Sequence, residues 1–243
     1  MHLLIDNSNT RTKFALAEED SISQWRATFP TPDLSPATLD LTLKGIVFKK
    51  VTLCSVVPQV AEMMADYFTA PLHQISHHSN LPIEIDYPEP AQIGADRLAN
   101  TVAAVAKYGA PAIVIDFGTA VTFDVADDTG AYLGGAIAPG TASLRDYLHR
   151  RTALLPAIQL AEPKSAIGKS TQDAMQVGAV IGYRGLIREI LSQISSELGG
   201  APAIIATGGD AALIAAGLEE IQCIDPDLTL AGIESIGEAN HRK

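Results

Sequence analysis

Two stretches of this chain, far apart in the sequence, repeat one pattern of apolar and acidic residues. In each, an apolar run ends in an aspartate, Asp6 or Asp116, and a turn of small residues leads into a second apolar run. Such a pattern is typical of a β-hairpin, because Asn, Ser, Asp and Gly favour turns between strands. A pattern that recurs across half a chain indicates duplication of one structural unit. The sequence therefore predicts two similar α/β halves, each opening with an acidic hairpin.

The two predicted hairpins align residue by residue. Ser8 corresponds to Gly118, and Thr12 corresponds to Thr122, because each threonine stands six positions after the aspartate of its own hairpin. We therefore expect Thr12 and Thr122 to occupy equivalent positions on the two returning strands.

Predicted strands and helices alternate along the remainder of each half, as the spacing of apolar residues indicates. The first half is expected to contain a strand at 47–57 and helices at 59–68 and 95–108. The second half is expected to contain a strand at 132–138, a helix from about 142, a long helix at 171–198, a strand at 203–206, a helix near 210–216 and a final helix from 228.

A boundary between the halves is expected near residues 109–111, which gives an N-terminal lobe of residues 1–110 and a C-terminal lobe of residues 111–243. Duplicated α/β halves with paired acidic hairpins resemble the superfamily of acetate kinase, sugar kinases, heat-shock ATPases and actin. This resemblance implies two actin-like, ribonuclease H-like lobes around a nucleotide cleft. A likeness at the level of fold leaves the activity open.

The composition narrows the classes of partner. Hydrophobic residues make up 47% of the 243 residues, enough to form substantial cores, and the formal net charge is −11. Such a charge disfavours nucleic acid and anionic membranes, although Lys13 and Arg97 can still create a local site for a small anion. No apolar run is long enough to span a bilayer, and Cys54 and Cys223 resemble lone buried thiols on strands, so we expect a cytoplasmic protein.

The first hairpin has the residues of a phosphate site. Backbone N–H groups in the turn after Asp6 can bind phosphate oxygens, its carboxylate can hold a hydrated divalent cation, and Lys13 can add a positive charge. An ordinary hairpin without any ligand is the alternative. The second hairpin supplies another carboxylate at Asp116 and hydroxyls at Thr119 and Thr122, all oxygen ligands that hard cations prefer.

A third candidate lies at the start of the helix predicted at 95–108, where Gly94 and Ala95 precede Asp96 and Arg97. A carboxylate in this place is explained by capping of the helix N-terminus. Arg97 is not, because a positive charge opposes the helix dipole there and needs another partner. Other candidates are weaker: His73, His77 and His78 lack the spacing of a metal site and are expected to be solvated loop residues.

Three segments, in this order, resemble the signature motifs of type III pantothenate kinases: Asp6–Lys13, Gly94–Arg97 and Asp116–Ala120. Weaker similarity extends over nearly the whole chain, at Tyr87, Gly134–Gly140, Gly168–Thr171 and Thr207–Asp210. The family transfers a phosphoryl group from ATP to pantothenate, giving ADP and 4′-phosphopantothenate in the first step of coenzyme A synthesis.

The resemblance also implies roles for individual residues. Asp96 would be the general base, Asp6 would hold Mg²⁺ through water, and Asp116 would bind a monovalent cation, K⁺ or NH₄⁺. The residues implied to bind ATP are Asp6, Asn7, Ser8, Asn9, Thr10, Arg11, Thr12, Lys13, Thr119, Gly208 and Gly209. Those implied to line the pantothenate pocket are Tyr87, Gly94, Ala95, Asp96, Arg97 and Thr171.

Two further implications concern assembly and departure from the family pattern. The family forms homodimers, and the predicted helix at 171–198 would supply the interface. Ser8 stands where the family usually has glycine, which affects the expected affinity for ATP. Two alternatives remain open: a non-catalytic regulator like the Bvg accessory factor branch of the same family, and another small-molecule kinase of the superfamily.

Overall fold

The computed structural model describes residues 1–18 and 21–241. The chain divides into two compact units. The first contains Met1–Tyr108, the short segment Gly130–Tyr132 and the C-terminal segment from Asp227. The second contains Gly109–Thr129 and Leu133–Pro226. Within the part of the chain that the structure describes, no helix has the length and hydropathy required to cross a membrane.

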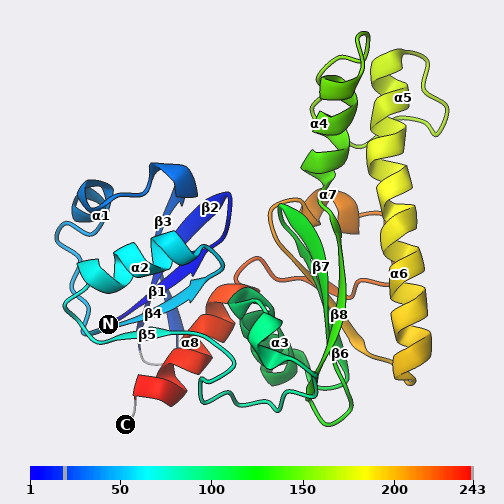
Figure 1. The fold of residues 1–243 in the computed structure, drawn as a ribbon. Helices are drawn as coiled ribbons and strands as arrows, with labels where there is room; N and C mark the ends of the chain where they lie inside the picture. Colours follow the sequence, from blue (N-terminus) through cyan, green and yellow to red (C-terminus); the bar gives the residue numbers. More distant parts are fainter. Residues whose placement is uncertain (19–20, 242–243) are drawn as a thin grey trace. The chain divides into compact units, whose positions relative to one another are not determined.

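The first unit is built on a five-stranded mixed sheet with the strand order β3, β2, β1, β4, β5 (Figure 1). The strands are β1 (His2–Asn7), β2 (Arg11–Glu18), β3 (Ser21–Pro30), β4 (Lys50–Ser55) and β5 (Leu72–Gln74). β1 is antiparallel to β2 and parallel to β4, so the hairpin that carries Asp6 lies at the centre of the sheet.

Alternating side chains of β1 contact helices on both faces of this sheet, as the period of a strand requires. Leu3 and Ile5 pack with α1 (Pro36–Thr42) and α2 (Pro58–Tyr67). Leu4 packs with α3 (Ala95–Tyr108) and α8 (Leu228–His241). β1 is therefore buried on both sides, and the turn that follows it is held on a rigid base. Two single 3₁₀ turns, η1 (Thr31–Asp33) and η2 (Pro90–Gln92), complete the unit's regular structure.

The second unit repeats this topology with the strand order β8, β7, β6, β9, β10. The strands are β6 (Ala112–Phe117), β7 (Ala120–Ala126), β8 (Tyr132–Pro139), β9 (Ala203–Thr207) and β10 (Cys223–Ile224). β6 is antiparallel to β7 and parallel to β9, as β1 is to β2 and β4. The predicted duplicated α/β fold is confirmed.

A long helical segment covers one face of the second sheet (Figure 1). It consists of α5 (Thr171–Val177), the π-helical turn η3 (Gly178–Gly182) and α6 (Tyr183–Leu198). Ile187 and Leu191 of α6 pack into the core formed by β6 and β7. The other helices of the unit are α4 (Thr141–Arg151) and α7 (Ala211–Ala215). The predicted helix at 171–198 is present, interrupted by a π turn between two glycines.

The register of the second hairpin differs from the sequence alignment. Lys13 pairs with Asp6, but it is Thr122 that pairs with Asp116. Thr12 pairs with Asn7 and is therefore equivalent to Val121, so the expected equivalence of Thr12 and Thr122 is wrong. The reason is the length of the turn. Four residues lie between the paired Asn7 and Thr12 of the first hairpin, and three lie between the paired Phe117 and Val121 of the second.

The C-terminal segment belongs to the first unit, whereas a single division after residue 110 would assign it to the second. Helix α8 packs closely there because two of its residues lack side chains. A Cβ on Gly232 would lie 1.9 Å from the carbonyl oxygen of Ala99 in α3, and one on Gly237 would lie 2.3 Å from Thr52 Oγ1. Close helix packing of this kind depends on tertiary contacts that a boundary placed by sequence cannot include.

Two local expectations need adjustment, those for Cys223 and His73. Cys54 is buried as predicted, but Cys223 is only half-buried, in the two-residue strand β10. His73 is not a loop residue: it lies in β5, half-buried, with Nε2 2.9 Å from Ser79 Oγ. His77 and His78 lie in a turn, as expected.

Candidate active site

The tip of the first hairpin is held by a network of buried polar side chains. The Asn7 amide donates to Thr12 Oγ1 at 2.7 Å and accepts a hydrogen bond from Ser55 Oγ at 2.6 Å. Thr31 Oγ1 lies 3.0 Å from Thr12 Oγ1 and donates to the Ser8 carbonyl at 2.7 Å. Asn7 and Thr12 thus form the framework of the turn. Asn9, Thr10 and Arg11 are exposed at the tip.

Ser8 is accommodated within this turn. Its backbone N–H and its hydroxyl both donate to the carbonyl oxygen of Arg11, at 3.1 and 2.9 Å. The hydroxyl therefore bonds within the turn, where it adds a second contact to the one that the backbone N–H makes.

Asp6 is buried at the base of the turn and forms an ion pair with Lys13, whose Nζ lies 3.3 Å from Asp6 Oδ2. Burial raises the pKa of Asp6, because it penalises the charged form, and the Lys13 ammonium opposes this rise. A buried carboxylate of this kind gains from additional positive charge, which fits a magnesium ion bound next to it.

Asp96 occupies the first turn of α3, where its Oδ1 accepts the backbone N–H of Arg97 at 2.9 Å. Burial raises the pKa of Asp96; the Arg97 N–H lowers it, and the nearby Asp6 carboxylate raises it further. Gly94 makes room for the carboxylate, since a Cβ there would lie 2.5 Å from Asp96 Oδ1. The first unit thus brings Asp96 within electrostatic range of Asp6.

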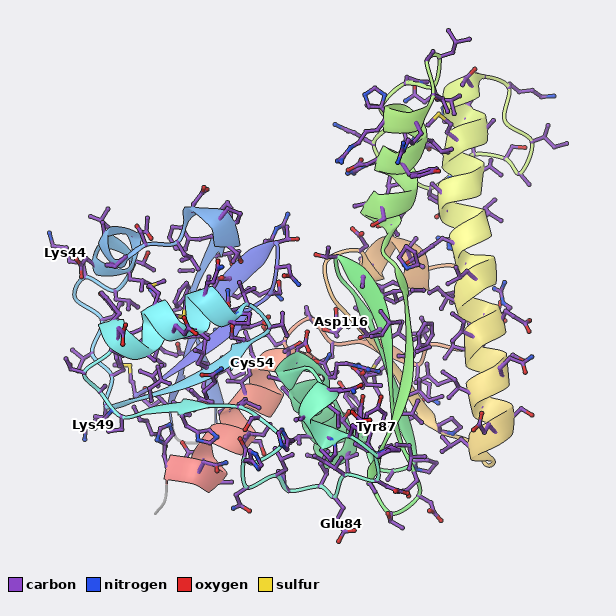
Figure 2. All side chains as sticks on the ribbon, viewed as in Figure 1. Lys44, Lys49, Cys54, Glu84, Tyr87 and Asp116 are labelled. Atoms are coloured by element: carbon purple, nitrogen blue, oxygen red, sulfur yellow. The ribbon has the colours of Figure 1, made fainter. Side chains whose placement is uncertain are left out.

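Arg97 and Tyr87 also meet in the first unit, through a residue that sequence reasoning missed. The Arg97 guanidinium lies over the ring of Tyr132, with 5.7 Å from Cζ to the ring centroid. The ring of Tyr87, labelled in Figure 2, lies 6.2 Å from the same ring. The sequence signal was weak, because Tyr132 appears only as the first residue of a predicted strand.

In the second unit, Asp116 lies near the end of β6 (Figure 2), half-buried, and Gly118 and Thr119 are exposed in the turn that follows. Gly208, at φ +93°, closes against this turn: a Cβ there would lie 2.5 Å from Asp116 Oδ1 and 2.6 Å from the carbonyl oxygen of Phe117. Only glycine suits the position, because both the backbone angle and the space exclude a side chain.

Two more segments meet around this turn. A Cβ on Gly140 would lie 2.5 Å from the carbonyl oxygens of Gly118 and Thr119. Asp210 ends the segment Thr207–Asp210 but was given no role from the sequence. It donates its backbone N–H to the Phe117 carbonyl at 3.3 Å, and its carboxylate accepts a hydrogen bond from the hydroxyl of Thr141. The backbone at Gly208 and Gly140 thus packs closely against the turn that follows Asp116.

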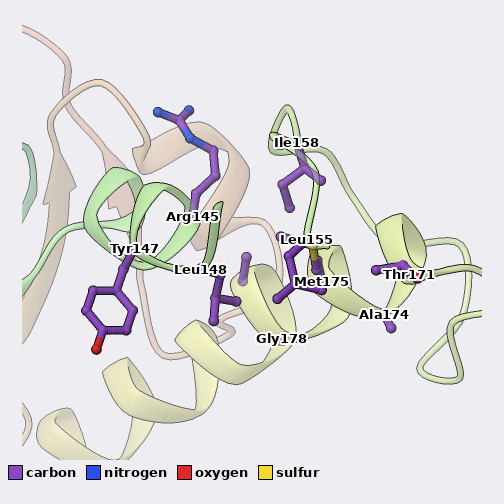
Figure 3. Close-up of a pocket in the computed structure, with 10 residues that line it drawn as sticks. Arg145, Tyr147, Leu148, Leu155, Ile158, Thr171, Ala174, Met175 and Gly178 are labelled. Carbon is purple, nitrogen blue, oxygen red and sulfur yellow. The ribbon is translucent and has the colours of Figure 1, made fainter. Parts of the chain in front are cut away.

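Thr171 lies in another part of the second unit, exposed at the start of α5. It lines a mainly apolar groove of about 480 Å³ together with residues of α4, α5 and the segment between them (Figure 3). Its lining includes Tyr147, Leu148 and Met175, and none of the other predicted site residues.

The residues implied to hold metal ions do not form a self-sufficient metal centre. Among the described residues, no three His, Cys, Asp or Glu side chains are close enough to hold a metal ion. Single carboxylates at Asp6 and Asp116 fit ions that complete their coordination with phosphate, water or carbonyl oxygens.

Comparison with known proteins identifies the family. The family model for type III pantothenate kinases matches residues 2–193. A type III pantothenate kinase of Akkermansia muciniphila is 56% identical over 232 residues, covering 96% of each chain.

Solved structures support the fold. A putative 2-dehydro-3-deoxygalactonokinase from Sinorhizobium meliloti aligns with a TM-score of 0.60 at 15% identity, covering 98% of this chain and 99% of that one. A putative Baf family transcriptional activator from Campylobacter jejuni aligns with a TM-score of 0.67 at 21% identity, covering 99% and 100%. The family match covers most of the sequence, and from it we conclude that this chain belongs to the type III pantothenate kinases.

Proposed function

We propose that this protein phosphorylates pantothenate with ATP as an active enzyme, through a general base on α3 and phosphate binding at the first hairpin. Family membership gives the reaction: ATP and pantothenate are converted to ADP and 4′-phosphopantothenate. The observation that carries the mechanism is the proximity of two carboxylates with raised pKa values, Asp96 and Asp6, in one unit.

Asp96 is proposed as the general base. Its carboxylate accepts the proton of the primary hydroxyl of pantothenate while the hydroxyl oxygen attacks the γ-phosphorus of ATP. The bond from the γ-phosphorus to the bridging oxygen breaks, and ADP leaves with that electron pair. A raised pKa makes Asp96 a stronger base than an ordinary carboxylate, and the Arg97 N–H keeps it oriented.

The first hairpin is proposed to bind the phosphates of ATP. Backbone N–H groups at the exposed tip and the Lys13 ammonium would attract the phosphate oxygens, and Asp6 would hold Mg²⁺ through water. Bound magnesium would supply positive charge that stabilises the transferring phosphoryl group. Asn7 and Thr12 contribute by fixing the turn rather than by contact, because their side chains are buried.

The second hairpin is proposed to hold a monovalent cation at Asp116, with Thr119, Gly208 and Gly209 contributing to ATP binding. The Asp116 carboxylate and the Phe117 carbonyl, against which the backbone of Gly208 packs closely, are oxygen groups of the kind that hard cations prefer, and this supports the assignment. A bound K⁺ or NH₄⁺ would supply positive charge near the phosphates of the nucleotide.

Pantothenate is proposed to bind at Tyr87, Gly94, Ala95 and Arg97, with the Arg97 guanidinium pairing with its carboxylate. Thr171 is proposed to contribute from a second copy of the chain in a homodimer. Exposed large apolar side chains of the second unit support an interface: Tyr147 and Leu148, which line the groove at Thr171, and Leu154, Ile167 and Ile181.

The alternatives are not favoured. Asp6, Lys13, Asp96 and Asp116 are all present, which argues against a regulator that has lost activity. The likeness to the Campylobacter protein concerns the fold alone at 21% identity. Another small-molecule kinase is disfavoured by the 56% identity to a type III pantothenate kinase.

A coupled assay of ADP release tests the proposed function. Purified protein is supplied with MgATP and either pantothenate, glucose, glycerol or acetate, in KCl, NH₄Cl or NaCl. We expect turnover with pantothenate only, and faster turnover in K⁺ or NH₄⁺ than in Na⁺. Turnover that needs no monovalent cation would refute the assignment of Asp116, and no turnover under any salt would support the regulator.

Sedimentation at micromolar concentration tests the homodimer. Leu154 is 90% exposed in the second unit, and Leu41 is 76% exposed in α1 of the first unit. Leu154→Glu is expected to shift the protein towards monomer and to lower its activity, while Leu41→Glu leaves the mass unchanged. A wild-type protein that sediments as a monomer would contradict the proposal.

A further inference from the structure

Tyr132 is a residue that the second sheet contributes to the first unit. It is the first residue of β8, yet it belongs with the first unit, together with Gly130 and Ala131. Its backbone forms a parallel bridge to the segment before α3: Tyr132 N–H donates to the Glu84 carbonyl, and Asp86 N–H donates to the Tyr132 carbonyl, both at 2.9 Å. This segment continues directly to Tyr87.

The side chain of Tyr132 is completely buried, at 0% exposure, among Ile93, Leu98 and partly buried residues of the segment from Leu81 to Tyr87. Its backbone bonds and its packing both fix the ring in one place. Because the ring is already fixed, a neighbouring side chain can pack against it without any further loss of conformational entropy by Tyr132.

Two residues of the proposed pantothenate pocket contact this one ring. The Arg97 guanidinium lies 5.7 Å from its centroid, within the range of a cation–π interaction. The Tyr87 ring lies 6.2 Å away, tilted by 58°, within the range of aromatic pairing. Arg97 and Tyr87 come from separate segments, α3 and the loop before it, so Tyr132 is the group that both share.

The ring contact favours the charge of Arg97. This residue lies in the first turn of α3, where its charge opposes the helix dipole, and its long side chain has many rotamers. The face of a buried aromatic ring attracts a cation and limits those rotamers.

We propose that Tyr132 is a positioning residue for pantothenate: its buried ring holds the Arg97 guanidinium and the Tyr87 ring in the orientation that binds the carboxylate-bearing substrate. This inference rests on the proposed function, in which Arg97 and Tyr87 contact pantothenate. Tyr132 itself acts through Arg97 and does not take part in phosphoryl transfer.

Steady-state kinetics and calorimetric titration with pantothenate test the inference. Tyr132→Leu removes the ring and is expected to raise the pantothenate KM and Kd roughly 3- to 30-fold, with kcat and the ATP KM within about twofold of wild type. Tyr132→Phe keeps the ring and should retain wild-type pantothenate affinity. Because the effect passes through Arg97, adding Tyr132→Leu to Arg97→Met should raise the pantothenate KM little further.

A matched control separates positioning from stability. Phe68 is also a buried aromatic residue of the first unit, paired edge-to-face with Phe48 and Tyr67 in a different core cluster. Phe68→Leu should lower the melting temperature without changing the pantothenate KM. If Tyr132→Leu does not fold, phenylalanine and pentafluorophenylalanine incorporated at position 132 provide the same test, because fluorination weakens the cation–π interaction and preserves ring shape.

The outcomes are distinguishable. If Arg97→Met raises the pantothenate KM and loss of the Tyr132 ring does not, the positioning role is overturned and the proposed function stands. If Arg97→Met leaves the pantothenate KM unchanged, the role proposed for Arg97 fails and the inference fails with it. Equal increases in the ATP and pantothenate KM values for Tyr132→Leu would assign the residue a structural role only.

Discussion

The two acidic hairpins share a strand topology but place different residues opposite their aspartates. Lys13 is opposite Asp6, whereas Thr122 is opposite Asp116, because the second turn is one residue shorter. A one-residue difference in a turn changes which side chain faces the carboxylate, since successive residues of a strand point to opposite faces.

This difference separates two ways of neutralising a carboxylate. The Lys13 ammonium lies 3.3 Å from Asp6, so the protein itself supplies a cation at the first hairpin. At the second, the position opposite Asp116 carries a hydroxyl, and the backbone of Gly208 packs closely against the carboxylate and a backbone carbonyl. Duplication has retained the strands and the aspartate, and the two copies have diverged in what surrounds it.

The largest effect is expected from removal of the proposed general base, Asp96 in the first unit. Asp96→Asn keeps the shape of the side chain and an oxygen that accepts the Arg97 N–H, but it cannot take up a proton at neutral pH. We expect kcat to fall roughly 10²- to 10⁴-fold, with nearly unchanged melting temperature and ATP binding. The measurement is ADP release under saturating substrates together with a thermal melt.

Asp66, exposed on α2, provides the matched control, and Asp66→Asn should retain full activity. Because the pKa of Asp96 is raised, wild-type kcat/KM should begin to fall, as pH decreases, above the ordinary carboxylate value of 3.8. Wild-type turnover of Asp96→Asn would mean that this carboxylate only caps the helix.

The two units should also differ in acid stability, because among the described residues the first has a buried histidine, His2, with other histidines close to it. His2 Nε2 lies 2.7 Å from Thr52 Oγ1, and its ring lies 5.4 Å from that of His241. Burial lowers the pKa of His2 to about 4, with help from the charges of Lys50 and His241; Glu238, 3.4 Å away, opposes this.

Between pH 6.5 and about 4 the unfolded chain binds a proton that folded His2 excludes, so stability falls as pH falls, by roughly 3 kcal/mol over the window. Burial lowers the pKa values of His73 and His241 as well, which acts in the same direction. The raised pKa values of Asp6 and Asp96 act in the opposite direction.

Hydrogen exchange at pH 7 and pH 5 measures this contrast, and we expect protection to decrease first in β1, β4 and α8. His2→Gln should reduce the pH dependence, whereas His149→Gln, an exposed position on α4, should not. Equal loss of protection in both units would contradict the predicted asymmetry.

Asp116→Asn tests the second hairpin. Loss of the charge should reduce activation by K⁺, with a roughly 10- to 100-fold higher half-saturating concentration, as typical of a lost interaction with a charged group. Asp128→Asn, at an exposed position of the same unit, is the control. An unchanged response to K⁺ in Asp116→Asn would place the cation elsewhere.

The smallest effect is expected at Ser8. Its hydroxyl donates to the Arg11 carbonyl within the turn, and the backbone N–H makes the same contact, so the turn does not depend on the side chain. Ser8→Gly should change the ATP KM by less than about threefold, because a neutral hydrogen bond contributes little net free energy. A larger decrease in the KM would show that serine obstructs the nucleotide.

Several elements could be predicted because their determinants are local. The helix expected at 95–108 has the bounds Ala95–Tyr108, and the final helix begins at Leu228. β3 was missed although Trp25, Ala27 and Phe29 alternate along it, and α1 was missed although Ser35 provides a capping box. Both signals, the alternation in β3 and the capping box of α1, are present in the sequence, but each involves only a few residues.

The candidate site was predictable where a motif is contiguous. Asp6, Asp96 and Asp116 were selected from short segments whose residue types carry the chemistry. Tyr132 was not selected, and Asp210 was given no role although it ends the segment Thr207–Asp210. Each contacts residues distant in sequence: Arg97 and Tyr87 for the first, Thr141 and Phe117 for the second.

By itself, the sequence determined the duplicated α/β architecture, the family and the identity of the acidic residues, because apolar periodicity and contiguous motifs are local properties. Only the tertiary structure decided that Lys13 and Thr122 are the equivalent residues, that α8 joins the first unit through Gly232 and Gly237, and that Tyr132 lies beneath Arg97. Strand register and close packing depend on groups brought together from distant parts of the chain, and no local pattern records which of them will meet.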